Sequence, residues 1–171
     1  ALGRFPRSRY PEFTNCSRPK YAGENYKCAR KLFDLGNQML APFYAFAEDR
    51  SWKAKWGEPL RDRPETTYPQ RELLGIFWMT YFNAAYVEFF GKDRFSSLPG
   101  VEYNASGGAT IMLADRPQNV PDGLRDWVAA TLGKQSFVEL DTKYLLPKRQ
   151  GRHVLTFEQL RAFDAARENQ G

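Results

Sequence analysis

The spacing of apolar residues predicts a long helix followed by a short strand near the start of the chain. Apolar residues between positions 20 and 40 recur at steps of three and four, the period of an amphipathic helix, which we expect over 21–40. They are Tyr21, Cys28, Leu32, Leu35, Met39 and Leu40. We expect Gly36 and Asn37 to interrupt or fray this helix and Pro42 to end it. An apolar helix face serves a core or a dimer equally well, so the oligomeric state stays open. The aromatic segment 43–48 predicts a strand.

The most apolar stretch of the chain lies over residues 73–82 and predicts a central strand at 75–81. Asn83 then has the side chain of a helix N-cap, and Gly91 that of a helix stop. We therefore expect a two-turn helix between them. The adjacent Phe89 and Phe90 are expected to lie in the core.

Three further elements are predicted in the second half of the chain. Segments 101–105 and 109–113 flank Ser106, Gly107 and Gly108, which is the composition of a hairpin. A helix is expected over 121–133, closed by Gly133, and another over 157–167, opened by a capping box. The former carries Leu124, Trp127, Val128, Thr131 and Leu132 on one face; the latter has Thr156 and Gln159 as its capping box and Phe157, Leu160 and Phe163 as its stripe.

Helices and strands follow one another without a βαβ repeat, which favours an α+β fold. We expect a single domain over 1–171, with about four helices packed on one face of a mostly antiparallel sheet and with 1–18 as an extended N-terminal arm. No apolar run reaches the 18 residues of a membrane span, and the N-terminus lacks the apolar centre of a signal peptide. We expect a soluble, cytoplasmic protein.

The net charge of +5 is concentrated at one end of the chain. Residues 1–63 carry 13 Lys/Arg and 7 Asp/Glu, whereas 64–171 carry 12 and 13. A basic first third attracts nucleic acid, an anionic membrane or an acidic protein, or it serves solubility alone. The basic residues are scattered, so no polybasic membrane anchor or nucleic-acid tail is predicted.

The sequence lacks the usual motifs of catalysis. His153 is the single histidine, and neither a nucleophile elbow nor a phosphate-binding glycine loop occurs. Glu48 and Asp49 are expected to be solvated surface charges and not an acid/base pair. Cys16 and Cys28 lack the spacing of a metal site; they form a bridge or lie buried as small hydrophobes, and we prefer the second interpretation. We predict no enzyme activity, no metal and no cofactor.

The irregular segment 51–70 and the two charged residues before it predict a contact region. Trp and Arg are enriched at binding hot spots. The candidate partner-binding residues are Asp49, Arg50, Trp52, Lys55, Trp56, Arg61 and Arg63. Three interpretations remain open: the indole rings cover the sheet, they stack on single-stranded nucleic acid, or they contact an acidic protein.

The order of these segments resembles that of small bacterial immunity proteins. The resemblance spans about residues 20–133 and rests on 41–49 (APFYAFAED), on 74–91 (LGIFWMTYFNAAYVEFFG), on the Gly-Gly hairpin and on 113–117 (LADRP). Within these proteins it is most similar to the α+β family that neighbours restriction-endonuclease-fold toxins in polymorphic and type VI secretion systems.

The resemblance implies a cytoplasmic, non-enzymatic inhibitor that binds a cognate toxin and blocks its active site or its assembly. One departure is the charge, since inhibitors of nucleases are commonly acidic and this chain is basic. Its charge favours binding beside the active site, or a toxin of another activity. The alternative function is a nucleic-acid-binding module that uses the basic N-terminal third.

Overall fold

The described part of the chain contains a four-stranded antiparallel sheet. The computed structural model describes residues 22–48, 73–137, 139–141, 146–149 and 154–168. The strands are β1 (Tyr44–Ala47), β2 (Met79–Phe82), β3 (Val101–Tyr103) and β4 (Ala109–Met112), in the order β1-β2-β4-β3. All neighbouring strands run antiparallel. The α+β class and the antiparallel sheet predicted from the sequence are confirmed.

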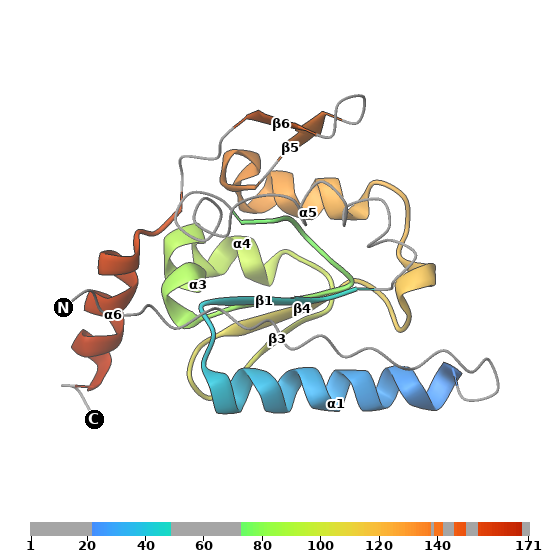
Figure 1. Cartoon of the computed structure of the whole chain (residues 1–171), viewed down its shortest axis with the longest axis horizontal. Coiled ribbons are helices and arrows are strands. Elements are labelled where there is room, and N and C mark those ends of the chain that lie inside the picture. The colour runs from blue at the N-terminus through green and yellow to red at the C-terminus, as the bar shows by residue number, and fades with distance from the viewer. Residues whose placement is uncertain (1–21, 49–72, 138, 142–145, 150–153, 169–171) are drawn as a thin grey trace.

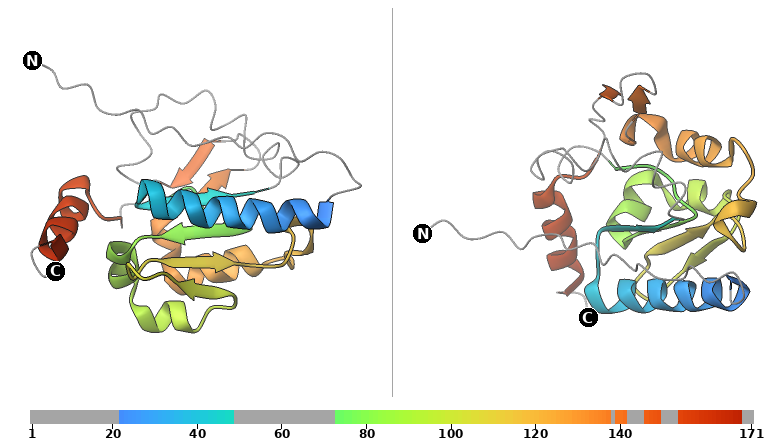
Figure 2. Two further views of the ribbon diagram at one scale, coloured as in Figure 1. Left: turned by 90° about the horizontal axis from the view of Figure 1, so that it is seen from below. Right: turned by 45° about the vertical axis from the view of Figure 1, so that its right-hand side comes forward.

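Helices cover both faces of this sheet. Within the described residues there are five α-helices: α1 (Ala22–Leu40), α3 (Ala84–Phe90), α4 (Lys92–Ser96), α5 (Leu124–Gly133) and α6 (Phe157–Glu168). Figures 1 and 2 show α1 on one face, α3, α4 and α5 on the other, and α6 beside α3. The expectation that the helices share one face is wrong for α1. All four residues of β2 are buried, as in a strand covered on both faces.

The predicted boundaries differ from the observed ones where glycine sets the backbone. The central strand begins at Met79 and not at residue 75, since Gly75 adopts a φ of +147° and 74–77 run irregularly. Helix α5 begins at Leu124 and not at residue 121, since Gly123 is left-handed at its N-cap. Helix α1 continues unbroken through Gly36, so the predicted interruption is wrong.

The local sequence signals are confirmed. Asn83 caps α3 by accepting a hydrogen bond from the Tyr86 backbone N–H at 3.1 Å. Thr156 and Gln159 exchange the two reciprocal hydrogen bonds of a capping box, 3.2 and 2.8 Å long. Strands β3 and β4 form the predicted hairpin, whose turn contains Gly107 with a φ of +76°.

Several short elements have no counterpart in the prediction. They are α4, the 3-10 helices η2 (Pro117–Asn119) and η3 (Lys134–Ser136), and a separate two-stranded sheet of β5 (Glu139–Asp141) and β6 (Leu146–Arg149). Helix α4 buries a single apolar side chain, Phe95. One buried residue gives no period, so such an element is invisible to a pattern of apolar spacing.

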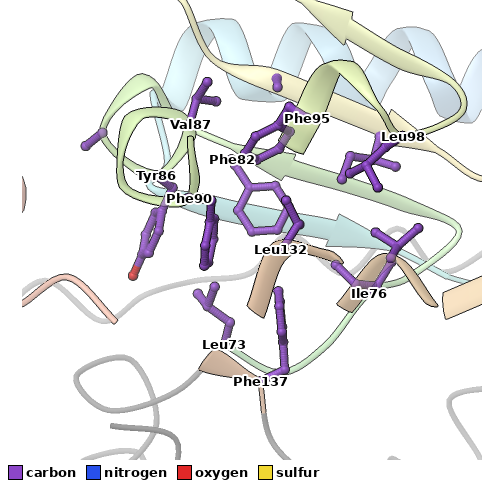
Figure 3. Packing of buried hydrophobic residues seen from close by; sticks show 14 of the residues in the cluster. Leu73, Ile76, Phe82, Tyr86, Val87, Phe90, Phe95, Leu98, Leu132 and Phe137 are labelled. Atoms are coloured by element: carbon purple, nitrogen blue, oxygen red, sulfur yellow. The ribbon is translucent and has the colours of Figure 1, made fainter. Parts of the chain in front are cut away.

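The core lies between the sheet and α3, α4 and α5, and Phe82 is at its centre (Figure 3). The Phe82 ring makes edge contacts with Phe90 and Phe95 at centroid distances of 5.8 and 5.5 Å. Phe90 also stacks on Phe137. Rings in these orientations contribute beyond their buried area, so this cluster anchors the described fold.

Three aromatic residues that we placed on packed faces are exposed instead. Phe89 lies on the outer side of α3, next to the buried Phe90, so the prediction that both belong to the core is wrong for Phe89. Trp127 on α5 and Phe157 at the start of α6 are also exposed. Each sits at the border of its helix's apolar face, where helical spacing alone does not separate buried from exposed positions.

Glu48 is buried, contrary to the expectation of a solvated charge. Its side chain is 0% exposed and its Oε2 accepts hydrogen bonds from the Arg125 guanidinium at 2.7 Å and from the Trp78 backbone N–H at 3.0 Å. Arg125 comes from α5, which covers the end of β1. The carboxylate, directly after β1, therefore joins α5 to the residue before β2 and is part of the fold.

Tyr86 links α3 to the segment before α6 and gives the fold an alkaline limit. Burial raises the pKa of Tyr86 to about 12, against the lowering effect of its hydrogen bond with the Leu155 backbone. The pKa of the folded state lies above the unfolded value of 10, so the protonated phenol stabilises the fold fully below pH 10. This stabilisation is lost as the pH rises towards 12. We expect a loss of about 2–3 kcal/mol.

In denaturant titrations, Tyr86→Phe should lose less stability between pH 9 and 12 than the parent. Tyr103→Phe, at an exposed tyrosine of β3, is the matched control and should follow the parent. Equal alkaline losses in the parent and in Tyr86→Phe would show that Tyr86 does not set this limit.

Candidate binding face on helix α1

The contact region predicted from the sequence is not placed by the structure. Asp49, Arg50, Trp52, Lys55, Trp56, Arg61 and Arg63 all lie outside the described residues, as do Cys16, His153 and the predicted arm 1–18. The three interpretations of the two tryptophans therefore stay predictions. A different candidate surface emerges from α1.

Helix α1 attaches to the sheet through a mostly polar face. The Tyr26 ring packs edge-on against Trp78 at 5.5 Å, and its hydroxyl hydrogen-bonds with Gln118. One turn on, Arg30 pairs with both carboxylate oxygens of Glu102 at 2.5 Å. Asn37 is buried two turns further along. These side chains follow helical spacing, so they define the inner face of α1.

The opposite side of α1 carries an apolar stripe that faces away from the sheet. We call Cys28, Leu32, Leu35 and Met39 the outer stripe. The exposed fractions of its three larger side chains are 45, 49 and 75%. Cys28 is a free, exposed cysteine, so the interpretation of this residue as a buried hydrophobe is wrong. The steps of four, three and four residues are those of a helix that packs against another element.

One row of the sheet face under α1 is polar and matches the inner face of the helix. Tyr81, Thr110 and Glu102 pair across β2, β4 and β3 and form a row on the sheet face under α1. This row offers hydrogen-bonding and charged groups, which match Arg30 and the other polar residues of the inner face. The apolar residues of the predicted helix thus include a set that the described fold leaves unmatched.

Gly36, at the edge of the outer stripe, is a glycine that the described packing does not require. Among the described residues, no heavy atom outside the helix backbone lies within 4 Å of the position that a Cβ would take. Glycine inside a helix costs about 1 kcal/mol relative to alanine. Nothing in the described packing requires it, whereas a missing side chain permits close approach of a second backbone.

Two positive charges border the outer stripe. Lys27 and Lys31 are exposed, stand one turn apart and border the stripe on one side; Ala29 and Gly36 border it on the other. In an antiparallel pair of two copies, the two lysine borders would face each other and repel. The border therefore matches a surface that carries carboxylates.

Replacing Gly36 with alanine should stabilise the free protein. Gly36→Ala is expected to raise the free energy of unfolding by about 1 kcal/mol, since the added methyl group meets open space and alanine favours the helix. Urea titration measures this change. Ala130→Gly, an exposed position of α5, is the reverse control and should lower stability by a similar amount. A destabilised Gly36→Ala would mean that this glycine has a role inside the fold.

Metal sites, membrane spans and similar proteins were each sought. Among the described residues, no group of three or more His, Cys, Asp or Glu is arranged to hold a metal ion. None of the described helices combines the length and apolarity needed to cross a bilayer. No family model, no curated protein and no solved structure matches this chain.

The sequence contained a signal for the outer stripe, because its spacing defines an apolar helix face. The direction of that face depended on the polar row of the sheet, which becomes visible only when the register of three strands is known.

Proposed function

We propose that this protein is an immunity factor that binds a cognate secreted bacterial toxin and neutralises it by stoichiometric contact. The single observation that carries the proposal is the outer stripe of α1, an exposed apolar surface opposite a polar face that is already paired. The resemblance to immunity proteins of polymorphic and type VI secretion systems supports the same function.

The surface defines the chemistry of the partner. Leu32, Leu35 and Met39 require an apolar groove or ridge, and Lys27 and Lys31 require carboxylates at its border. A basic surface that binds an acidic border of the toxin does not imitate nucleic acid. The chain would instead cover an exosite or block assembly, which agrees with its net charge of +5.

Co-expression with the product of the neighbouring gene tests the proposal. We expect that product to arrest growth when expressed alone, and growth to recover when the full chain is co-expressed. The two proteins should then co-purify in a fixed stoichiometry. Failure to rescue growth, or rescue without a complex, would contradict the immunity function.

A salt titration of the same complex distinguishes the proposal from nucleic-acid binding. Contacts to phosphates weaken steeply with salt because counterions are released, whereas a mixed apolar and charged protein interface responds weakly. We expect the affinity for the partner to change little between 50 and 200 mM salt, on the order of tenfold or less. Binding to a single-stranded oligonucleotide that falls about a thousandfold would favour the nucleic-acid alternative.

A further inference from the structure

A polar pocket of about 260 Å³ lies between the inner side of α1 and the strands β2, β4 and β3. Asp34, Asn37 and Gln38 line it from the helix. Tyr81, Thr110 and Glu102 line it from the paired row of the sheet. Its walls thus come from segments that are far apart in the sequence and that the fold holds in fixed register.

The floor of the pocket is shaped by a glycine. A Cβ at Gly108 would lie 2.4 Å from the Tyr81 hydroxyl oxygen, so only glycine leaves room for this ring. Tyr81 is buried, and its hydroxyl accepts a long hydrogen bond, 3.4 Å, from Nδ2 of Asn104. The position of the phenol is therefore defined by the hairpin turn.

The two carboxylates of the pocket are unequally neutralised. Both carboxylate oxygens of Glu102 accept hydrogen bonds from Nη2 of Arg30 at 2.5 Å. Asp34 Oδ2 lies 3.9 Å from Arg30 Nε, which makes a long ion pair. Burial raises the pKa of Asp34; Arg30 lowers it, and the neighbouring Glu102 raises it further. The Asp34 carboxylate, whose side chain is 43% exposed, is thus accessible to a closer cation.

Asn37, one turn from Asp34, has an unsatisfied donor. The residue is 7% exposed, lines the pocket, and its Nδ2 has no hydrogen-bond partner among the described residues. Buried amide groups are almost always paired, because an unpaired one loses its hydration without compensation. The Asn37 amide can donate a hydrogen bond to a ligand, and the Asp34 carboxylate can pair with a cationic group of the same ligand.

We propose that this pocket binds a small organic cation whose primary ammonium group pairs with Asp34 and whose neighbouring oxygen accepts a hydrogen bond from Nδ2 of Asn37. The volume of about 260 Å³ lies below that of pockets for drug-sized ligands, so the ligand has few atoms. This ligand would be distinct from the toxin partner of the proposed function.

Glycinamide is a suitable probe, because one carbon atom joins its ammonium group to its carbonyl group. NMR titration of the full chain should shift the side-chain amide signal of Asn37, with saturation in the millimolar range, about 1–10 mM. N-acetylglycinamide keeps the carbonyl groups but lacks the ammonium group, and it should leave that signal unchanged. A response to both compounds, or to neither, would overturn the proposal.

Asp34→Asn tests the charge at nearly constant shape. We expect roughly tenfold weaker glycinamide binding, with the thermal midpoint used to confirm folding. Asp93→Asn, at an exposed acid of α4, is the control and should bind as the parent does. Because the ligand needs the charged carboxylate, binding should also weaken as the pH falls through the raised pKa of Asp34, the other charges beside it being Arg30 and Glu102. Unchanged binding by Asp34→Asn would refute the site.

Discussion

Arg125→Ala is expected to lower the free energy of unfolding by about 3–5 kcal/mol, which is enough to unfold much of the protein at moderate temperature. The reason is the position of its partner. Glu48 has a fully buried side chain, and its Oε2 is 2.7 Å from the guanidinium of Arg125. Truncation of the arginine removes this cation from a carboxylate that lies away from water, and weakening the compensation of a buried charge costs more than the loss of one contact.

Urea titration of three variants separates charge from packing. Arg116→Ala removes a surface arginine that pairs loosely with Asp115 at 3.9 Å, and it should cost less than about 1 kcal/mol. The double variant Glu48→Gln/Arg125→Met removes both charges and retains much of the volume, so it should regain most of the stability that Arg125→Ala loses. Equal costs for Arg125→Ala and Arg116→Ala would show that the Glu48 charge is well hydrated.

The elements that were predicted correctly are those whose causes are local. Asn83 caps α3, Thr156 and Gln159 form their capping box, and the glycines after Ser106 turn the hairpin. Each of these needs only neighbours within five residues. The buried Glu48 could not be predicted in this way, because its cation lies 77 residues later in the chain.

The outer stripe of α1 could be predicted only in part from the sequence. The spacing of Leu32, Leu35 and Met39 shows that they share a helix face, yet it does not show which way that face points. The orientation becomes visible in contacts between distant segments, the Tyr26 ring against Trp78 and Arg30 with Glu102 at 2.5 Å across 72 residues, which place the polar side of α1 on the sheet. A local pattern thus predicts the surface, and contacts between segments distant in the sequence determine its direction.

The pocket beneath α1 was equally hidden from the sequence. Asp34, Asn37 and Glu102 are ordinary residues for a helix surface and a hairpin, and no motif joins them. Their relation arises from the strand register that brings Glu102 opposite Thr110 and Tyr81. The buried amide of Asn37 becomes informative only once its missing partner is known.

Leu35→Glu should weaken binding to the neighbouring gene product at least 100-fold, about 2.7 kcal/mol, while the fold keeps its stability. Leu35 lies in the middle of the outer stripe and is 49% exposed, so its replacement removes no core contact. Glutamate favours helices almost as well as leucine and stands four residues after Lys31, which preserves the stability of α1. In the complex, the same carboxylate would be buried against an apolar and acidic surface.

Isothermal titration calorimetry measures the affinity, and thermal unfolding confirms the fold. Phe89→Glu is the matched control, because Phe89 is an exposed apolar residue of α3 on the opposite side of the sheet from α1. It should leave binding unchanged. Gly36→Ala, which stabilises the free protein, should bind more weakly if the partner's backbone approaches that glycine. A complex that tolerates Leu35→Glu as well as Phe89→Glu would place the toxin elsewhere, and the tryptophan segment around Trp52 and Trp56 would then become the surface to test.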